Sequence, residues 1–423
     1  MDGWRDGAGQ RSRLQGNPEF ERRRNPPAQR ESGNLMAQGK HSPDIGIIGY
    51  GQSTYYKSTD RTLISLLAEA SRKAAESAGV KPREIDGLAV SSFMLPPDNA
   101  VTIAEHFGLS PSWANFFTAG GAGAVSTIAD GLRAIRDGKA KYVLCVAGDA
   151  YNVKEHFARA ANWSVAIRNF SAPHCSGGPK GFFAIVQRKH MREYGTTRAQ
   201  LGKISVGQRE SARLNPNALL RGALTLDDYL NARLIADPLR LYDCVLPCTG
   251  AEAVLLGPLD RAADGKGVRV RSAHEKHNYP AGDLTPLRGG WEAFKDALYD
   301  DAGYGPDDMD FVQAYDDFPI MVAIQLEDLG FCRKGEVGPF LERHSLAWNG
   351  SFPVNTGGGQ LSCGQTGAGG GMIGVFEAVA QLRGEAGERQ IGKARRGLVS
   401  GYGMIGFGHG LSSSAAILES VRQ

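Results

Sequence analysis

The sequence predicts an α/β protein in which two similar α/β halves follow one another along the chain. Apolar strands alternate with amphipathic helices over most of its length, which is the pattern of a parallel sheet covered by helices. Two glycine-rich turns, one in each half, lead into a helix and then into an apolar strand. With 42% hydrophobic and 22% charged residues among 423, the composition is globular and leaves room for two cores.

The first half is predicted from hydrophobic periodicity and glycine stops. A buried strand with a glycine turn opens it, and an amphipathic helix ends at a glycine. Residues 151–245 are richer in polar side chains and are predicted as an insertion of helices and loops. The expected elements are strands at 44–51, 85–92, 141–150 and 253–257, and helices at 63–79 and 119–138.

The second half repeats this order, and its last helix follows the stretch "NTGGGQLSCGQTGAGGG" at 355–371. Segments 120–149 and 367–403 align as glycine-rich turn, helix and strand, so an internal duplication of one α/β unit is the economical explanation. The predicted domains are a tail at 1–43, a half at 44–258 and a half at 259–423. Expected strands lie at 268–273, 309–318, 396–403 and 412–420, and expected helices at 290–303, 319–331 and 372–384.

Charge and targeting signals exclude several function classes. Residues 1–40 are polar, have no apolar core like that of a signal peptide, and are predicted to be disordered. They hold eight Lys/Arg and five Asp/Glu, which leaves 40 of each for the rest and gives no electrostatic case for nucleic acid binding. No run of eighteen apolar residues predicts a membrane span. Six scattered cysteines indicate reduced thiols and a cytoplasmic protein.

Metal binding is not predicted. Cys244 and Cys248 form a lone pair without a second pair, and the motif "HEKH" at His274–His277 is one residue short of a zinc-protease motif, so a surface loop is expected there.

The stretch 355–371 holds eight glycines, and three explanations are open: a phosphate cradle, a catalytic loop, or close packing of a helix. Two helices that begin with glycine-rich turns would gather free N–H groups and partial positive charge at their N-termini. If they face each other across a pseudo-twofold axis, they form one site for a developing anion. The phosphate explanation is weaker, because no G-x-x-x-x-G-K-[ST] motif is present and "GYGMIG" at 401–406 opens no Rossmann unit.

Three segments carry a family resemblance: "LEDLGFCRKGEVGPFL", "EYGTTRAQLGKISVGQRESARLNPNA" and "RLIADPLRLYDC". With the duplicated unit, they resemble the thiolase superfamily, most closely the branch related to sterol carrier protein x, over roughly 45–418. The resemblance implies a duplicated, five-layered αβαβα thiolase fold, usually dimeric, and a coenzyme A thioester as substrate with no tightly bound cofactor.

The catalytic positions of a thiolase are replaced here. The nucleophilic Cys at the start of the first-half helix matches Gly120 or its neighbour. The loop N-x-x-G-G-x-x-x-x-G-H-P falls on Asn355, Gly358, Gly359 and Gly364, with Gln365 in place of His. The N-E-A-F motif falls on "YDDF", which places Tyr315 and Asp316 at its first two positions. The second Cys falls on Tyr402 or Gly406, and His409 lies in the same C-terminal loop.

These replacements predict chemistry without an acyl-enzyme. Gln365 cannot take a proton and Gly120 cannot be acylated, whereas Asn355, Gln365 and the glycine N–H groups can stabilise a thioester enolate. Aldol or retro-aldol chemistry on a β-hydroxyacyl-CoA needs an enolate alone. Tyr315 is the predicted proton carrier, and its pKa would have to fall well below about 10 for it to act as a base. Asp316 could orient Tyr315, and Asp317 is expected to cap the helix that follows.

Two further functions stay open. One is a thiolase with an unconventional nucleophile, for which Cys363 is the candidate. The other is an acyl-CoA- or lipid-binding scaffold. Some thiolase-like retro-aldolases of steroid degradation lack the Cys, use tyrosines and work with a small zinc-ribbon/OB-fold partner, so the resemblance implies a homodimer that binds such a partner.

Overall fold

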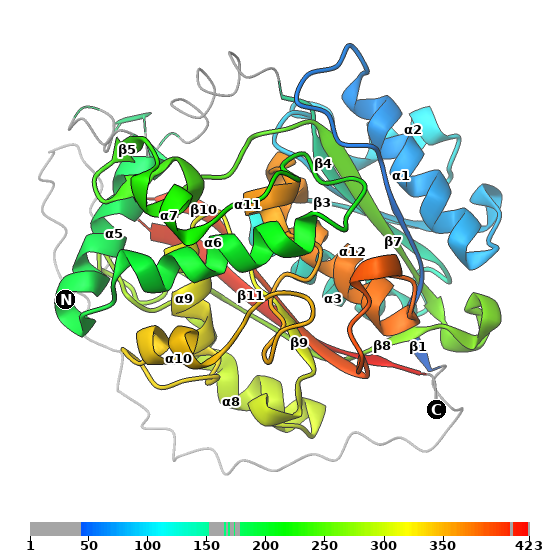
Figure 1. Cartoon of the computed structure of the whole chain (residues 1–423). Coiled ribbons are helices and arrows are strands. Elements are labelled where there is room, and N and C mark those ends of the chain that lie inside the picture. Colours follow the sequence, from blue (N-terminus) through cyan, green and yellow to red (C-terminus); the bar gives the residue numbers. More distant parts are fainter. Residues whose placement is uncertain are drawn as a thin grey trace, which may run out of the picture. The chain divides into compact units, whose positions relative to one another are not determined.

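The structure is a computed structural model, which describes residues 44–151, Val165, Arg168, Asn169, Pro173, 178–406 and 409–421. One sheet of nine strands runs through this part, in the order β3-β2-β4-β7-β1-β8-β11-β10-β9 (Figure 1). Five strands of the first half thus lie side by side, and four of the second half follow. The strands are β1 Ile45–Gln52, β2 Gly87–Ser91, β3 Trp113–Phe117, β4 Val143–Asp149, β7 Gly250–Pro258, β8 Val268–His277, β9 Phe311–Gln313, β10 Arg396–Gly406 and β11 His409–Ser420.

Helices cover both faces of these strands and also separate the two halves. In Figure 1, α1 and α2 lie on one side, α8, α9 and α10 on the other, and α3 and α12 between them. The helices are α1 Leu63–Ala78, α2 Ala100–Phe107, α3 Gly123–Arg136, α5 Pro179–Tyr194, α6 Arg198–Ala212, α7 Leu226–Asn231, α8 Gly290–Ala302, α9 Pro319–Asp328, α10 Val337–Arg343, α11 Gly359–Cys363 and α12 Gly370–Arg383.

Three hydrophobic cores establish a five-layered order. Neighbouring residues of a strand point to opposite faces, and Ile48 packs with α1 and α2 while Ile47 packs with α3 and α12. The middle core also takes Val399 and Leu418 from the second half. The third core joins the remaining face of those strands to α8 and α9. The first-half and second-half strands of the sheet thus form two separate layers, and the order is helix, first-half strands, paired central helices, second-half strands and helix.

The sequence prediction of a parallel sheet is wrong for most of these strands. β2 pairs in parallel with β3 and β4, and β10 with β9, but β7, β8 and β11 run antiparallel to their neighbours. Periodicity indicates which face of a strand is buried and carries no information about the direction of its neighbour. "HEKH" ends strand β8 instead of forming a loop, and α2 and β3 were not expected.

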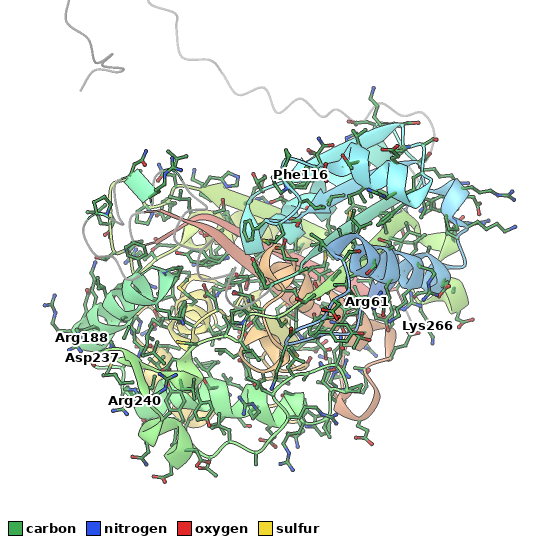
Figure 2. All side chains as sticks on the ribbon, turned by 90° about the horizontal axis from the view of Figure 1, so that it is seen from above. Arg61, Phe116, Arg188, Asp237, Arg240 and Lys266 are labelled. Carbon is green, nitrogen blue, oxygen red and sulfur yellow. The ribbon has the colours of Figure 1, made fainter. Side chains whose placement is uncertain are left out.

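Helices α5, α6 and α7 fill the part of the predicted insertion that the structure describes. Arg188 of α5 forms an ion pair with Asp237, in the turn of the β5 Leu234–Ala236 and β6 Leu239–Arg240 hairpin (Figure 2). Helix α6 of the insertion packs against α11, and Ala212 there lies against Gly358. The insertion therefore supports the glycine-rich segment.

Candidate active site

The two glycine-rich turns meet at the centre of the molecule, as the duplication predicts. Each begins with a single 3₁₀ turn, Gly120–Ala122 before α3 and Gly367–Gly369 before α12. A Cβ atom on Gly371 would lie 1.9 Å from the carbonyl oxygen of Gly121, so the helix starts touch backbone to backbone. This contact tolerates only glycine, and it brings two helix N-termini to one place.

Tyr315 lies at this junction. It follows β9, and a Cβ atom on Gly121 would lie 1.9 Å from its ring. Tyr315 lines a cavity of about 20 Å³ together with Asn355, Gly359, Gly370 and Cys363, which is room for about one water molecule. The glycine turn of α3, which holds Gly120, therefore faces a tyrosine ring.

Gln365 reaches the same tyrosine. Its side-chain amide donates to the Tyr315 hydroxyl at 3.5 Å and to the Gln360 amide oxygen at 3.2 Å. Its backbone is fixed by bonds to Leu246 (2.8 Å) and Cys248 (2.9 Å). The Gln365 amide, predicted to take the place of a thiolase histidine, is thus a hydrogen-bond donor held against a phenol.

Burial sets the protonation state of Tyr315. Removal from water raises the pKa of its hydroxyl well above its ordinary value, and the nearby carboxyls Asp317 and Asp316 raise it further. A tyrosine that acts as a base would need a lowered pKa, and burial shifts the pKa of Tyr315 in the opposite direction. Tyr315 is therefore a neutral phenol that can donate a proton or a hydrogen bond.

Asp316 holds the short helix α11 in place. Its carboxyl accepts the N–H groups of Gln360 (2.9 Å) and Leu361 (3.1 Å), the first turn of α11. Burial raises the pKa of this carboxyl to about 7, although these hydrogen bonds act in the opposite direction. Asp316 is thus a helix cap that is about half ionised near neutral pH, and through Gln360 it also positions Gln365.

Asp317 does not cap α9, as the sequence predicted. That helix begins after Phe318 without any side-chain cap. The Asp317 carboxyl is buried, its Oδ1 atom has no hydrogen-bond partner, and burial together with Asp316 raises its pKa well above the ordinary value. Burial therefore favours the protonated form of this acid.

The glycines of the loop serve its conformation. Gly358, Gly359 and Gly364 have φ of 104°, 55° and 113°, and each lies against a neighbouring group that a Cβ atom would strike. The N–H of Gly358 bonds to Asn355 O (2.7 Å) and that of Gly364 to Gln360 O (3.1 Å). Asn355 itself has φ of 52° and closes this turn. The N–H groups of Gly358 and Gly364 are thus used within the loop, which favours the side chains of Gln365 and Tyr315 as donors to a substrate.

Cys363 lies at the site, but its thiol is not activated as a nucleophile. Its Sγ atom donates to Gly357 O (3.0 Å) and accepts from the Asn215 amide (3.4 Å). Burial raises the pKa of this thiol far above its ordinary value, and the Glu377 carboxyl adds to the effect. A nucleophilic cysteine needs the opposite shift.

Tyr402, a predicted site residue, is not among the residues that line this cavity. The ring of Tyr402 packs on Trp291 with centroids 5.2 Å apart, and its hydroxyl accepts the N–H of Gly410. This is the environment of a structural tyrosine. His409 begins β11, and its side chain lies outside the described residues.

Sequence reasoning missed three side chains around the loop. Gln360 contacts both Gln365 and Asp316, while Glu252 and Asp149 lie beneath the turn 366–369. A carboxyl inside the apolar strand "GAEAVLLG" was the available signal for Glu252. Within the described residues, no three His, Cys, Asp or Glu side chains are grouped as metal ligands. Nor does any helix found there have the length and apolarity to cross a membrane.

Comparisons with known proteins agree with this geometry. The family model "Thiolase C-terminal domain-like" matches residues 239–420. The chain is 31% identical to an acetyl-CoA acetyltransferase of Methanothermobacter thermautotrophicus, over 86% of this chain and 97% of the relative. It is 32% identical to the 17-hydroxy-3-oxo-4-pregnene-20-carboxyl-CoA lyase of Mycobacterium tuberculosis, over 81% and 92%. A solved structure titled "Ltp2-ChsH2(DUF35) aldolase" superposes with a TM-score of 0.77 at 27% identity, covering 90% of this chain and 100% of the other.

Five layers with paired glycine-rich helix starts at their centre define an enzyme of thiolase type. The chain belongs to the thiolase superfamily, in the branch related to sterol carrier protein 2 that also contains steroid side-chain-cleaving aldolases. The predicted family and fold are therefore confirmed.

Proposed function

We propose that the protein makes or breaks a carbon–carbon bond of a β-hydroxyacyl-CoA by aldol or retro-aldol chemistry, through a thioester enolate and without an acyl-enzyme. The observation that carries the proposal is the contact between Gln365 and Tyr315, beside a helix start that offers glycine and no thiol. By the motif match, Tyr315 and Gln365 take the places of a thiolase's asparagine and histidine. Two relatives whose names denote a lyase and a side-chain-cleaving aldolase support the same chemistry.

In the cleavage direction, the proton of the β-hydroxyl passes to a base and the Cα–Cβ electron pair becomes the enolate. Asp316 is the proposed base, since a carboxyl with a pKa of about 7 is half ionised at neutral pH. Gln365 and the neutral Tyr315 hydroxyl donate to the charge that develops on oxygen, and Tyr315 protonates Cα. The products are a ketone or aldehyde and a shortened acyl-CoA, and the proton taken by Asp316 restores Tyr315.

The decisive experiment incubates the enzyme with a β-hydroxyacyl-CoA and follows the carbonyl product and the shortened acyl-CoA by chromatography. A parallel reaction supplies a β-ketoacyl-CoA with free CoA. We expect retro-aldol products in the first reaction and no thiolysis in the second. Thiolysis that iodoacetamide abolishes by labelling Cys363 would establish the thiolase alternative, and acyl-CoA binding without turnover in either reaction would establish the scaffold.

The same proposal extends to a partner protein. The similar solved structure carries a second component in its title, ChsH2(DUF35). We propose a small zinc-ribbon/OB-fold protein as the partner of this chain. Co-expression with such a protein from the same gene neighbourhood should yield a complex that survives size-exclusion chromatography, and the absence of a complex would count against the partner.

We also propose that the enzyme is a homodimer. β3 is one of the two outer strands of the sheet, and its Phe116 and Phe117 are only half buried (Figure 2 labels Phe116). An uncovered edge with aromatic side chains favours pairing with another strand, and sheets that continue across subunits are what the thiolase resemblance implies. Light scattering at micromolar concentration would test it, with a monomer as the contrary result.

For the location we propose the cytoplasm. Five cysteines lie in the described part of the chain and all are free thiols. Reduced, buried thiols are the usual state there. Fractionation with detection by antibody would decide it, and recovery from a secreted or membrane fraction would contradict it.

A further inference from the structure

A buried ion pair between Glu377 and Arg389 lies beside the catalytic cavity and has no role in the proposed chemistry. Glu377 belongs to α12 and lines the cavity, and Arg389 lies in the turn that follows this helix. The guanidinium of Arg389 donates to both carboxylate oxygens, from Nε at 3.1 Å and from Nη2 at 2.8 Å. Only 3% of Glu377 and 8% of Arg389 are exposed. The carboxylate of Glu377 is therefore held in one orientation.

Thr356 of the glycine-rich loop binds the same carboxylate. Its hydroxyl donates to Glu377 Oε1 at 2.9 Å and accepts the side-chain amides of Gln313 (2.9 Å) and Gln381 (3.2 Å). A threonine hydroxyl has one proton and two lone pairs, so these three contacts use all of them. Because two amide donors already point at its oxygen, the hydroxyl proton of Thr356 points at Glu377.

These contacts join the two segments that carry the predicted site residues. Thr356 directly follows Asn355, and Gln313 ends β9 two residues before Tyr315. The hydrogen bond between Gln313 and Thr356 therefore fixes the loop against the end of the strand that carries Tyr315. The ion pair fixes the same threonine to α12.

Gly357 connects the ion pair to Cys363. A Cβ atom on Gly357 would lie 2.7 Å from Glu377 Oε2, and because Arg389 holds that oxygen, only glycine fits here. The carbonyl oxygen of Gly357 accepts the Cys363 thiol at 3.0 Å and the Asn215 amide at 2.9 Å. Displacement of the loop from the ion pair would break the hydrogen bond of the thiol, so the reactivity of Cys363 reports the position of the loop.

We propose that Glu377 and Arg389 are positioning residues of the glycine-rich loop, which act through Thr356 to hold Asn355 and Tyr315 in one fixed arrangement. A buried ion pair often contributes no more to stability than apolar side chains would, and its best-attested use is to specify a single arrangement. A carboxylate that accepts hydrogen bonds from three side chains at once does so in only one orientation of the loop. The effect on turnover rests on the proposed aldol function, whereas the effect on the loop does not.

Thr356→Val tests the proposal in the full-length protein, because valine has nearly the shape of threonine and lacks the hydroxyl. The measurement is the rate at which iodoacetamide alkylates Cys363, followed by peptide mass spectrometry. Cys145, which is fully buried in the middle core, reports opening of the whole molecule in the same sample. In Thr356→Val we expect alkylation of Cys363 to rise at least about fivefold, while that of Cys145 changes less than about twofold. Thr356→Ser, which keeps the hydroxyl, should hold the Cys363 rate within about twofold of the wild type.

Thr196→Val is the matched control. Thr196 is also buried, and its hydroxyl has no hydrogen-bond partner in the part of the chain that the structure describes, so the substitution should change neither rate. Arg389→Lys covers the case in which Thr356→Val does not fold, since lysine keeps the charge and loses the planar two-point contact. It should likewise raise the alkylation of Cys363 alone. Equal rises at Cys363 and Cys145, or a Cys363 rate that stays at the wild-type value, would overturn the proposal.

Turnover gives a second measurement once a working assay exists. Thr356→Val should lower kcat about tenfold and leave acyl-CoA affinity within about twofold of the wild type, because the displaced groups act on the transition state. A weaker affinity with unchanged kcat would contradict the positioning role. If no hydroxyacyl-CoA turns over, the aldol function fails, while the alkylation rates still decide the role of the ion pair.

Discussion

At the scale of single residues, the candidate site offers neutral hydrogen-bond donors and buried carboxyls where a thiolase has a thiolate. Tyr315 keeps its proton because it is buried beside two acids, and Gln365 keeps its orientation because its backbone and side chain are both bonded. Burial raises the pKa of the Cys363 thiol in the same cavity and so makes it a poor nucleophile. Substitutions can test Tyr315, Gln365 and Cys363 one at a time, since each substitution is expected to change kcat by a different amount.

Gln365→Leu preserves approximate volume and removes the amide donor. An interaction that strengthens in the transition state affects kcat more than substrate binding. We therefore expect kcat to fall about 10²-fold, within the range measured for single oxyanion donors, with little change in acyl-CoA affinity by calorimetry. Tyr315→Phe should cost more, on the order of 10³-fold, because it also removes the proton. The reverse order of the two losses would contradict the roles assigned here.

Cys363→Ser tests whether the Cys363 thiol takes part in catalysis. Its Sγ atom makes only two hydrogen bonds, both of which a serine hydroxyl can replace. We expect kcat within about threefold of wild type and no slowing of inactivation by iodoacetamide. A dead Cys363→Ser enzyme beside an active Tyr315→Phe enzyme would instead establish covalent catalysis.

Glu252 makes stability depend on pH in a defined direction. The unfolded chain releases this proton near pH 4.5, whereas the folded protein holds it to about pH 8. The folded state therefore binds more protons across this window, and stability falls as pH rises through it. Between pH 5 and pH 8.5 the Tm of the wild type should drop by about 2–5 °C more than that of Glu252→Gln. Parallel curves for the two proteins would show that Glu252 does not keep its proton.

At the scale of elements, the active site depends on the contact between the starts of α3 and α12. Gly371 meets the backbone of Gly121, which cannot move aside as a flexible side chain could. The same contact places Tyr315 beside the α3 turn. The glycine-rich stretch is thus explained mainly by packing and by positive φ, and its catalytic value comes from the side chains that this packing brings together.

Gly371→Ala should force the two helices apart. We expect a loss of about 1–3 kcal/mol of stability, typical of overpacking in a tight interior, and a large loss of activity. Gly222→Ala is the control, because a Cβ atom there meets nothing within 4 Å, and it should stay within about 0.5 kcal/mol. Denaturant unfolding measures both. Equal stability of the two variants would mean that the helix starts can separate at no cost.

At the scale of the whole molecule, the proposed homodimer predicts that the outer strand β3 forms the contact between subunits. Phe116→Lys places a charge on the proposed strand contact, and we expect light scattering to report a monomer at micromolar concentration. Val101→Lys is the control on α2, where the side chain is 70% exposed, and it should leave the dimer intact. A Phe116→Lys protein that stays dimeric would place the interface elsewhere. Activity of the monomer would show that one chain holds a complete site.

Much of this organisation follows from the sequence alone. Alternating apolar segments, a repeated turn–helix–strand unit and local motifs indicate an α/β fold, a duplication and the family, because each depends on residues close together in the chain. They also identify Tyr315, Asp316 and Gln365, which the structure brings together around the glycine loop. The absence of a cysteine at Gly120 likewise needs no coordinates.

Three properties were decided only by the tertiary structure. They are the direction of the strands, the protonation of the buried side chains, and the contacts that hold the glycine-rich loop in place. Antiparallel pairing of β7, β8 and β11 depends on chain reversals that periodicity does not encode. The pKa of Tyr315 is raised because distant segments bury its hydroxyl, whereas the sequence had led us to expect a lowered pKa. Asp316 caps a helix more than forty residues away instead of its own, and Asp149 and Glu252 meet the turn 366–369 from more than a hundred residues away. Desolvation and long-range hydrogen bonds arise only when remote segments exclude water together, and local sequence carries no measure of that.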